Sequence, residues 1–182
     1  ADVYTPMLKM ISSEYCNQIA YDELQIHGGT GYMKDFPVER LYRDARITTI
    51  YEGTTQLQVV AAIRGVQTNA FLNRIKEYED AELRPELEYL RRMLVAMTVE
   101  YEKAAHFVMN KDDDEFLDFH ARRLVEMAGN VIMGYLLLLD TMREDEYQSI
   151  AEVFIKRAEA NNKERLHYIY NTEHRDLGII KQ

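Results

Sequence analysis

Apolar residues recur at helical spacing along most of this 182-residue chain. The clearest run follows Pro85, where apolar positions alternate steps of four and three: Leu90, Leu94, Met97, Tyr101, Ala104 and Val108. This spacing follows the 3.6-residue period of an α-helix and puts all of these side chains on one face. We therefore expect a helix that begins at Pro85 and buries this stripe.

Two further helices are expected after that one. Asp112, Asp113 and Asp114 suit a helix N-terminus, because carboxylates stabilise the positive end of the helix dipole. The helix that follows would bury an inner face made of Leu117, Leu124, Ala128, Val131, Tyr135 and Leu138. A last helix is expected over about 146–170, and no segment has a strong strand pattern. The predicted fold class is all-α, with an antiparallel helical bundle over 66–182.

The beginning of the chain carries turn signals between helices. A helix over 5–26 is expected to end at the Gly28-Gly29 pair, followed by a turn-rich loop over 27–36. Pro37 suits the first turn of a short helix that runs to about residue 45.

Another helix is expected after a loop at 51–53. Thr55 and Gln58 have the spacing of a capping box, in which a hydroxyl and a side-chain amide satisfy the first backbone amides. This helix is expected to run to about Val66.

Glycine and charge are both spread unevenly. Of the 8 glycines, most fall in the first 65 residues. Residues 1–65 carry 8 acidic and 6 basic residues, whereas 66–182 carry 23 and 16. We therefore predict two segments: a glycine-punctuated one over 1–65 and an acidic helical one over 66–182.

The composition disfavours several classes of protein. A net charge of −9 argues against nucleic-acid binding, which needs clustered basic charge. A single cysteine rules out a disulfide framework and favours a reducing compartment. No apolar run approaches the roughly 18 residues of a membrane-spanning helix, so no integral membrane segment is expected. The chain shows no signal peptide and no initiator Met, which leads us to expect a processed end or the cut end of a longer protein.

The stretch from 25 to 56 is the most informative for chemistry. Gly28-Gly29 would let a ligand or another backbone approach closely. Glu52 lies on a loop just before a helix N-terminus, where Thr54, Thr55 and Gln56 offer polar groups to an anion such as a pyrophosphate. The helix end favours the charged carboxylate, while burial under an apolar ligand favours the neutral one. Such opposed effects can tune a general base.

The same residues also have a purely structural interpretation. Glycine pairs commonly end helices, threonines cap them, and Glu-Gly is an ordinary loop sequence. Spacing alone leaves both interpretations open.

Three longer segments in this stretch resemble one family. They are Gln25-Ile26-His27-Gly28-Gly29-Thr30-Gly31-Tyr32, Pro37-Val38-Glu39-Arg40-Leu41-Tyr42-Arg43-Asp44-Ala45 and Ile50-Tyr51-Glu52-Gly53-Thr54-Thr55-Gln56. In this order they resemble the C-terminal helical domain of the acyl-CoA dehydrogenases. The resemblance covers about residues 5–66, and the rest reads as a helical C-terminal extension.

The resemblance implies an FAD-dependent oxidoreductase that converts an acyl-CoA thioester to the 2,3-enoyl-CoA, as in fatty-acid β-oxidation. Glu52 would be the catalytic base that removes a proton next to the thioester while FAD takes a hydride from the next carbon. Tyr51 and Gly53 would lie against the substrate.

The resemblance also implies how FAD is held. Gln25, Gly28 and Gly29 would hold its ADP part, often that of a neighbouring subunit, and Thr54 and Gln56 would also contact FAD. It implies an electron-transfer flavoprotein as electron acceptor and a homo-oligomer. The compartment would be the bacterial cytoplasm or the mitochondrial matrix.

Members of the family also have an N-terminal helical domain and a middle β-domain, which this chain lacks. We therefore expect that this chain alone neither holds FAD tightly nor turns over acyl-CoA. An alternative is a non-catalytic helical interaction or oligomerisation module derived from the family.

A metal-binding bundle is a third hypothesis. Glu164 and His167 have the Glu-x-x-His spacing of a di-iron ligand pair, but no second pair follows. The sequence therefore predicts no metal site. Isolated histidines are expected at the surface: His106, His120 and His174. Cys16 lies within a predicted helix and is expected to be a small packing residue. Gly129 and Gly134 are expected to mark a close helix crossing.

Overall fold

The computed structural model describes residues 3–68, 71–173, 175, 176 and 178. Within these residues the chain forms seven α-helices and one short 3-10 helix, and no strand. The predicted all-α fold is confirmed. The chain divides into two compact units, Ala1–Ala62 and Ile63–Gln182, which are described one at a time.

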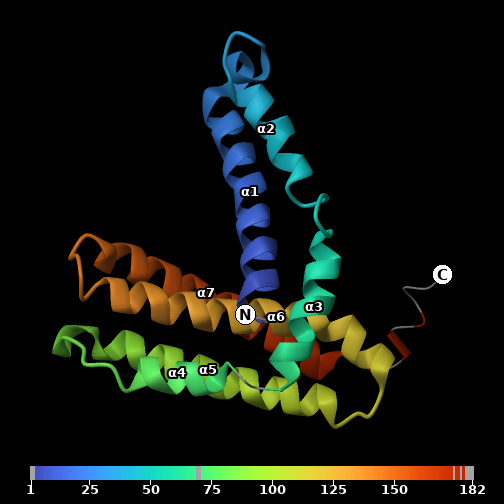
Figure 1. Cartoon of the computed structure of the whole chain (residues 1–182), viewed down its shortest axis with the longest axis vertical. Coiled ribbons are helices and arrows are strands. Elements are labelled where there is room, and N and C mark those ends of the chain that lie inside the picture. The colour runs from blue at the N-terminus through green and yellow to red at the C-terminus, as the bar shows by residue number, and fades with distance from the viewer. Residues whose placement is uncertain (1–2, 69–70, 174, 177, 179–182) are drawn as a thin grey trace. The chain divides into compact units, whose positions relative to one another are not determined.

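The first unit is built on a pair of helices, α1 (Tyr4–Tyr32) and α2 (Val38–Ile47), which lie side by side (Figure 1). The amide of Asn17 on α1 donates to the carbonyl of Ala45 at 2.9 Å and to that of Ser13 at 2.8 Å. At the turn between the helices, the rings of His27 and Phe36 meet edge to face at 5.6 Å. The two helices therefore run antiparallel.

The end of α1 differs from the sequence-based expectation. The helix breaks at Gly28, which has φ 62° and ψ −149°, but helical structure resumes and continues to Tyr32. The expected loop over 27–36 is therefore wrong for its first half. Glycine tolerates the left-handed φ of the break at little cost, so a single residue redirects the chain.

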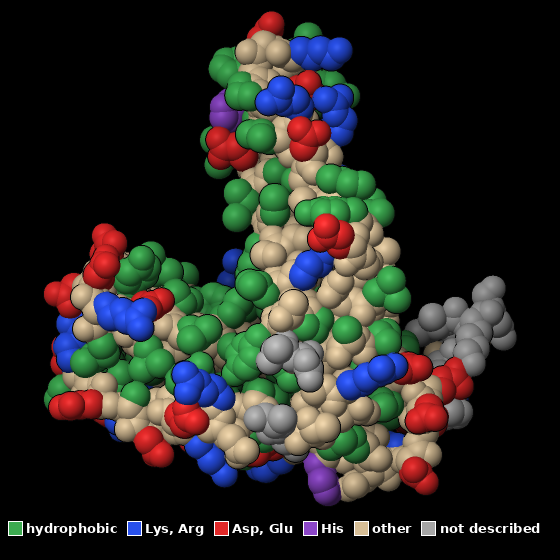
Figure 2. Space-filling view, viewed as in Figure 1, with side chains coloured by type: hydrophobic (Ala, Val, Ile, Leu, Met, Phe, Trp, Pro, Cys, Tyr) green, Lys and Arg blue, Asp and Glu red, His purple; other side chains and the backbone are tan. Residues whose placement is uncertain are grey.

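One face of α1 carries an exposed apolar stripe. Leu8, Ile19 and Ile26 are 70%, 65% and 80% exposed, and Tyr15 is also exposed. Their spacing returns each to the same side of the helix. Figure 2 shows several groups of apolar side chains along the visible face of α1 and α2, with charged side chains near the turn between them. A stripe of this kind is typical of a surface that packs against another element.

A third helix, α3 (Thr55–Gln67), begins in the first unit and ends in the second. The second unit then contains the five elements α4 (Leu72–Glu79), η1 (Pro85–Leu87), α5 (Glu88–Met109), α6 (Asp114–Asp140) and α7 (Tyr147–Asn171). Helices α5, α6 and α7 pack on one another, and α4 packs on α6 (Figure 1). Among the described residues, no helix combines the length and apolarity needed to cross a membrane.

Helix α4 is absent from the sequence-based prediction. It has only eight residues, and its buried apolar side chains are Leu72 and Ile75, with Phe71 just before it. An apolar pattern this short does not distinguish a helix from a loop. Packing of these side chains on α6 stabilises the helix, and the local sequence pattern does not show this packing.

The predicted stripe of α5 is confirmed, because all six of its apolar residues are buried. The predicted start of α6 is also confirmed: Asp113 is its N-cap, and its carboxylate accepts from the amides of Glu115 and Phe116. A side-chain carbon at Gly134 would overlap a methyl group of Leu94, so Gly134 does mark a close crossing of α6 with α5.

Two single-residue predictions are wrong. Cys16 is exposed rather than a packed residue of its helix. His120 is fully buried rather than at the surface, and its ring lies 4.5 Å from that of Phe116 and 5.0 Å from that of Phe119. These two partners lie on α6 itself, and the ring of Tyr168 on α7 lies 6.3 Å from that of His120, so packing of α7 against α6 contributes to its burial. His174 lies outside the described residues.

Burial gives His120 an unusual titration. Both ring nitrogens are buried and lack a hydrogen-bond partner in the described structure. Burial, and next the charge of Arg123, lowers the pKa of His120 to about 4. The folded chain therefore holds this ring neutral at pH 6, where a solvated histidine is partly charged.

The free energy of unfolding of the chain should therefore decrease on acidification, because of the buried His120. Below about pH 6.5 the unfolded chain binds this proton and the folded chain does not, so the free energy of unfolding decreases until about pH 4. The expected loss is on the order of 3 kcal/mol. Urea denaturation of His120→Phe at pH 7.5 and 4.5 should show a smaller loss than the parent chain. The exposed His106→Phe is the control, and equal losses in both variants would contradict the prediction.

Candidate active site

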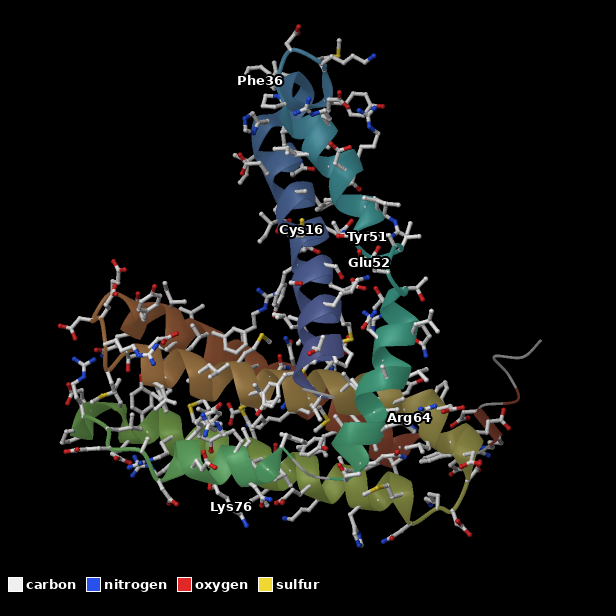
Figure 3. The ribbon with its side chains drawn as sticks, viewed as in Figure 1. Cys16, Phe36, Tyr51, Glu52, Arg64 and Lys76 are labelled. Carbon is white, nitrogen blue, oxygen red and sulfur yellow. The ribbon has the colours of Figure 1, made fainter. Side chains whose placement is uncertain are left out.

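The residues between α2 and α3 form a tight loop with unusual backbone geometry. Glu52 has φ 52° and the next residue, Gly53, has φ 90°. Such values are easy for glycine but unfavourable for glutamate. Figure 3 shows Tyr51 and Glu52 on this loop. The surrounding structure must therefore hold Glu52 in place.

Local hydrogen bonds close the loop on itself. The amide of Tyr51 donates to the carbonyl of Ile47 at 3.1 Å, and that of Thr55 donates to the carbonyl of Thr49 at 3.1 Å. The side-chain amide of Gln58 donates to the carbonyl of Glu52 at 3.0 Å and reaches that of Gly53 at 3.4 Å. The loop is thus bound to both flanking helices.

One further contact comes from α1. The ammonium of Lys9 donates to the carbonyl of Gly53 at 2.7 Å and lies 5.6 Å from the centre of the Tyr51 ring. Sequence reasoning missed Lys9 because it lies 44 residues before Gly53 and belongs to no local pattern.

The cap of α3 differs from the prediction. Thr54 is the capping residue, since its hydroxyl accepts from the amide of Leu57 at 3.4 Å. The hydroxyl of Thr55 is buried and has no hydrogen-bond partner in the described structure. Gln58 binds the loop carbonyls instead of completing a capping box with Thr55. The left-handed residues shift the helix start by one position relative to the predicted box.

The predicted substrate and flavin residues of this loop come together at the N-terminus of α3. Tyr51, Glu52, Thr54 and Gln56 are exposed, and Gly53 is half-buried. An exposed carboxylate beside a helix N-terminus is open to a ligand. Chemically, the arrangement offers a proton acceptor next to an anion-binding helix end.

The other predicted flavin residues lie at the opposite end of α1. Gly28 is 19 residues beyond Lys9, which corresponds to about 28 Å along a helix. Gln25 is exposed, and a side-chain carbon at Gly28 or Gly29 would meet nothing within 4 Å. The backbone there is open to a close ligand, as a nucleotide-binding role requires. The structure therefore forms two separate groups of candidate residues.

Metal ligands do not gather anywhere in the described part of the chain, where no group of three or more His, Cys, Asp or Glu could hold an ion. Glu164 and His167 are both exposed on α7.

The chain matches two family models that meet at residue 67. Residues 2–67 match "Acyl-CoA dehydrogenase, C-terminal domain" and residues 67–177 match "Acyl-CoA dehydrogenase C terminal". The chain belongs to the acyl-CoA dehydrogenase family. This confirms the resemblance seen in the three sequence segments.

The first curated relatives match about a third of the chain, 29% to 33% of its length. A caffeyl-CoA reductase-Etf complex subunit from Acetobacterium woodii is 58% identical over 52 residues, which are 29% of this chain and 14% of that protein. The curated relatives first in similarity share segments that make up 14% to 15% of their own length. The chain thus spans a small part of these proteins.

Two solved structures extend the comparison. An acyl-CoA dehydrogenase family protein from Porphyromonas gingivalis is 36% identical, with a TM-score of 0.59, over 62% of this chain and 98% of that one. An acyl-CoA dehydrogenase complexed with FAD from Bacillus anthracis has a TM-score of 0.75 at 18% identity, over 96% of this chain and 34% of that one. The second likeness shows the fold alone.

The left-handed loop makes a prediction about its glycine. Gly53→Ala should destabilise the chain by roughly 1–2 kcal/mol, because alanine disfavours a positive φ. Its side-chain carbon would also lie 2.6 Å from the Gln58 amide nitrogen and displace it. Gly29→Ala is the control: the position is helical and open, so it should be neutral or slightly stabilising. Urea denaturation of both variants tests this, and equal effects would refute it.

Proposed function

We propose that this chain is the C-terminal part of an FAD-dependent acyl-CoA dehydrogenase, with Glu52 as the catalytic base. The observation that carries the proposal is the placement of Glu52, exposed on a left-handed loop at the N-terminus of α3. An acyl-CoA thioester would present its C2–H to this carboxylate. Glu52 would take that proton, and transfer of a hydride from C3 to bound FAD would complete the oxidation to the 2,3-enoyl-CoA.

The loop would also stabilise the charge that develops on the thioester oxygen. The backbone amide of Glu52 is a donor within the same tight loop, and amides fixed in advance stabilise an enolate-like transition state. Gly53 leaves room beside the base because it has no side chain. Tyr51 flanks the base on the other side and would line the acyl group.

The chemistry of this base works in both directions. A relative of this chain is named a reductase, and reduction of an enoyl thioester would need the same carboxylate as a proton donor to C2. The proton acceptor of oxidation is the proton donor of reduction by microscopic reversibility. We assign this chain to the oxidative direction.

FAD fits the residues present. Thr54 and Gln56 at the start of α3 would contact it, since a helix N-terminus favours a pyrophosphate. Gln25, Gly28 and Gly29 offer an exposed amide and an open backbone for its ADP part. When bound, FAD supplies the hydride acceptor for C3. Gln25, Gly28 and Gly29 lie 16 to 20 residues beyond Lys9, which contacts the loop, and this corresponds to about 24–30 Å along a helix. This separation supports their serving the flavins of two subunits in a homo-oligomer.

The rest of the active site would come from parts of a longer protein. The apolar stripe of α1 is exposed at Leu8, Ile19 and Ile26, as expected for a helix that packs on absent elements. We therefore propose that this chain alone neither retains FAD nor turns over acyl-CoA.

The electron acceptor, the metabolic process and the compartment are proposed from the same family membership. An electron-transfer flavoprotein would accept the electrons, in line with the relative named as part of an Etf complex. The process would be fatty-acid β-oxidation in the bacterial cytoplasm or the mitochondrial matrix. A non-catalytic module is the weaker alternative, because it would not need a strained glutamate held at a helix N-terminus.

Replacing the base tests the proposal. In the full-length enzyme, Glu52→Gln should abolish acyl-CoA dehydrogenation, because an amide cannot accept the proton, while flavin content stays at the parent level. Dye reduction and flavin absorbance measure the two properties. Glu39→Gln, on α2, is the control and should keep parent activity. Substantial activity in Glu52→Gln would place the base elsewhere.

A further inference from the structure

We infer that Lys9 is a positioning residue that holds the loop of the catalytic base against α1. This inference rests on the proposed function of Glu52. Lys9 contacts the residues on both sides of Glu52: its ammonium donates to the carbonyl of Gly53 and lies against the ring of Tyr51. It thereby brackets the base without a direct ion pair, since the ion pairs of the described residues include none between Lys9 and Glu52.

Both contacts have favourable geometry. A distance of 2.7 Å is short for a hydrogen bond from nitrogen, as expected where the donor carries a charge. The 5.6 Å from the ammonium to the Tyr51 ring centre lies within the range of a cation–π interaction. The hydrogen bond is partly buried, so water competes with it less than on an open surface.

The loop needs a contact of this kind because its own bonds are local. Hydrogen bonds from Tyr51, Thr55 and Gln58 connect it to α2 and α3, which are its direct continuations. These bonds fix the shape of the loop. Among the hydrogen bonds of the described residues to positions 51–54, the one from Lys9 connects them to α1.

The position of α1 matters because it carries the other candidate flavin residues. Gln25, Gly28 and Gly29 lie on the same helix as Lys9. Lys9 therefore ties the base loop to the helix that also carries the predicted nucleotide contacts. Loss of the Lys9 hydrogen bond would let Glu52 leave the geometry that proton transfer requires. A small displacement of a catalytic group lowers the reaction rate substantially.

The effect of the Lys9 contacts on opening of the loop can be measured in this chain without any catalysis. Lys9→Met keeps much of the aliphatic length but removes the charge. Hydrogen exchange at the amides of Thr55 and Gln58 should become roughly tenfold faster, because the loop opens more often. Lys34→Met, an exposed lysine in the turn before α2, is the matched control and should leave both rates unchanged. Unchanged rates in Lys9→Met would overturn the inference.

Kinetics of the full-length enzyme test the consequence. Lys9→Met should lower kcat roughly tenfold, with KM within about twofold and flavin content unchanged, because positioning acts on the chemical step. Lys9→Arg should restore most of the rate, since a guanidinium can both donate to Gly53 and stack on Tyr51. A parent kcat in Lys9→Met, or equal loss in Lys9→Arg, would overturn the positioning role.

Failure of this inference differs from failure of the proposed function. If Glu52→Gln stays active, the base lies elsewhere, whatever the exchange rates show. If Glu52→Gln is inactive while Lys9→Met keeps its parent kcat, the base stands and the role of Lys9 is refuted.

Discussion

The candidate active site depends on one backbone constraint: Glu52 and Gly53 both adopt positive φ immediately before α3. This geometry turns the carboxylate outward at a helix N-terminus and turns the neighbouring carbonyls toward Lys9 and Gln58. Glutamate disfavours such a conformation by roughly 1–2 kcal/mol, so it persists where surrounding contacts hold it. The strained glutamate, its helix end and its two donors form one connected unit.

The two units of the chain differ in how completely they bury their apolar residues. In the second unit, the faces of α5 and α6 meet and Gly134 allows them to cross closely. A buried hydrogen bond between Asn130 and Asn162, at 2.8 Å, fixes the register of α6 and α7. In the first unit, Leu8 and Ile26 remain largely exposed. The unit that carries the candidate chemistry thus leaves more of its large apolar side chains exposed and open to packing by other parts of a protein.

The sequence patterns predicted the features that follow from helical periodicity and local hydrogen bonds. They missed the features that depend on contacts between residues far apart in the chain. The stripe of α5 and the Asp113 cap follow from periodicity and local hydrogen bonding, and both are confirmed. The short helix α4 and the burial of His120 depend on tertiary packing, which no local pattern encodes. The family resemblance of residues 50–56 indicated Glu52 as the candidate base. The left-handed φ of Glu52 and the hydrogen bond from Lys9 to its neighbour Gly53 became visible only in the structure.

The central claim is that Glu52 moves the proton at C2 of an acyl thioester. Solvent deuterium entering C2 of a saturated acyl-CoA isolates this step from net oxidation, and it can be followed by mass spectrometry in the anaerobic full-length enzyme. We predict that the parent enzyme incorporates deuterium at C2 and that Glu52→Gln, with its flavin bound, does not. Incorporation by Glu52→Gln at the parent rate would contradict the account.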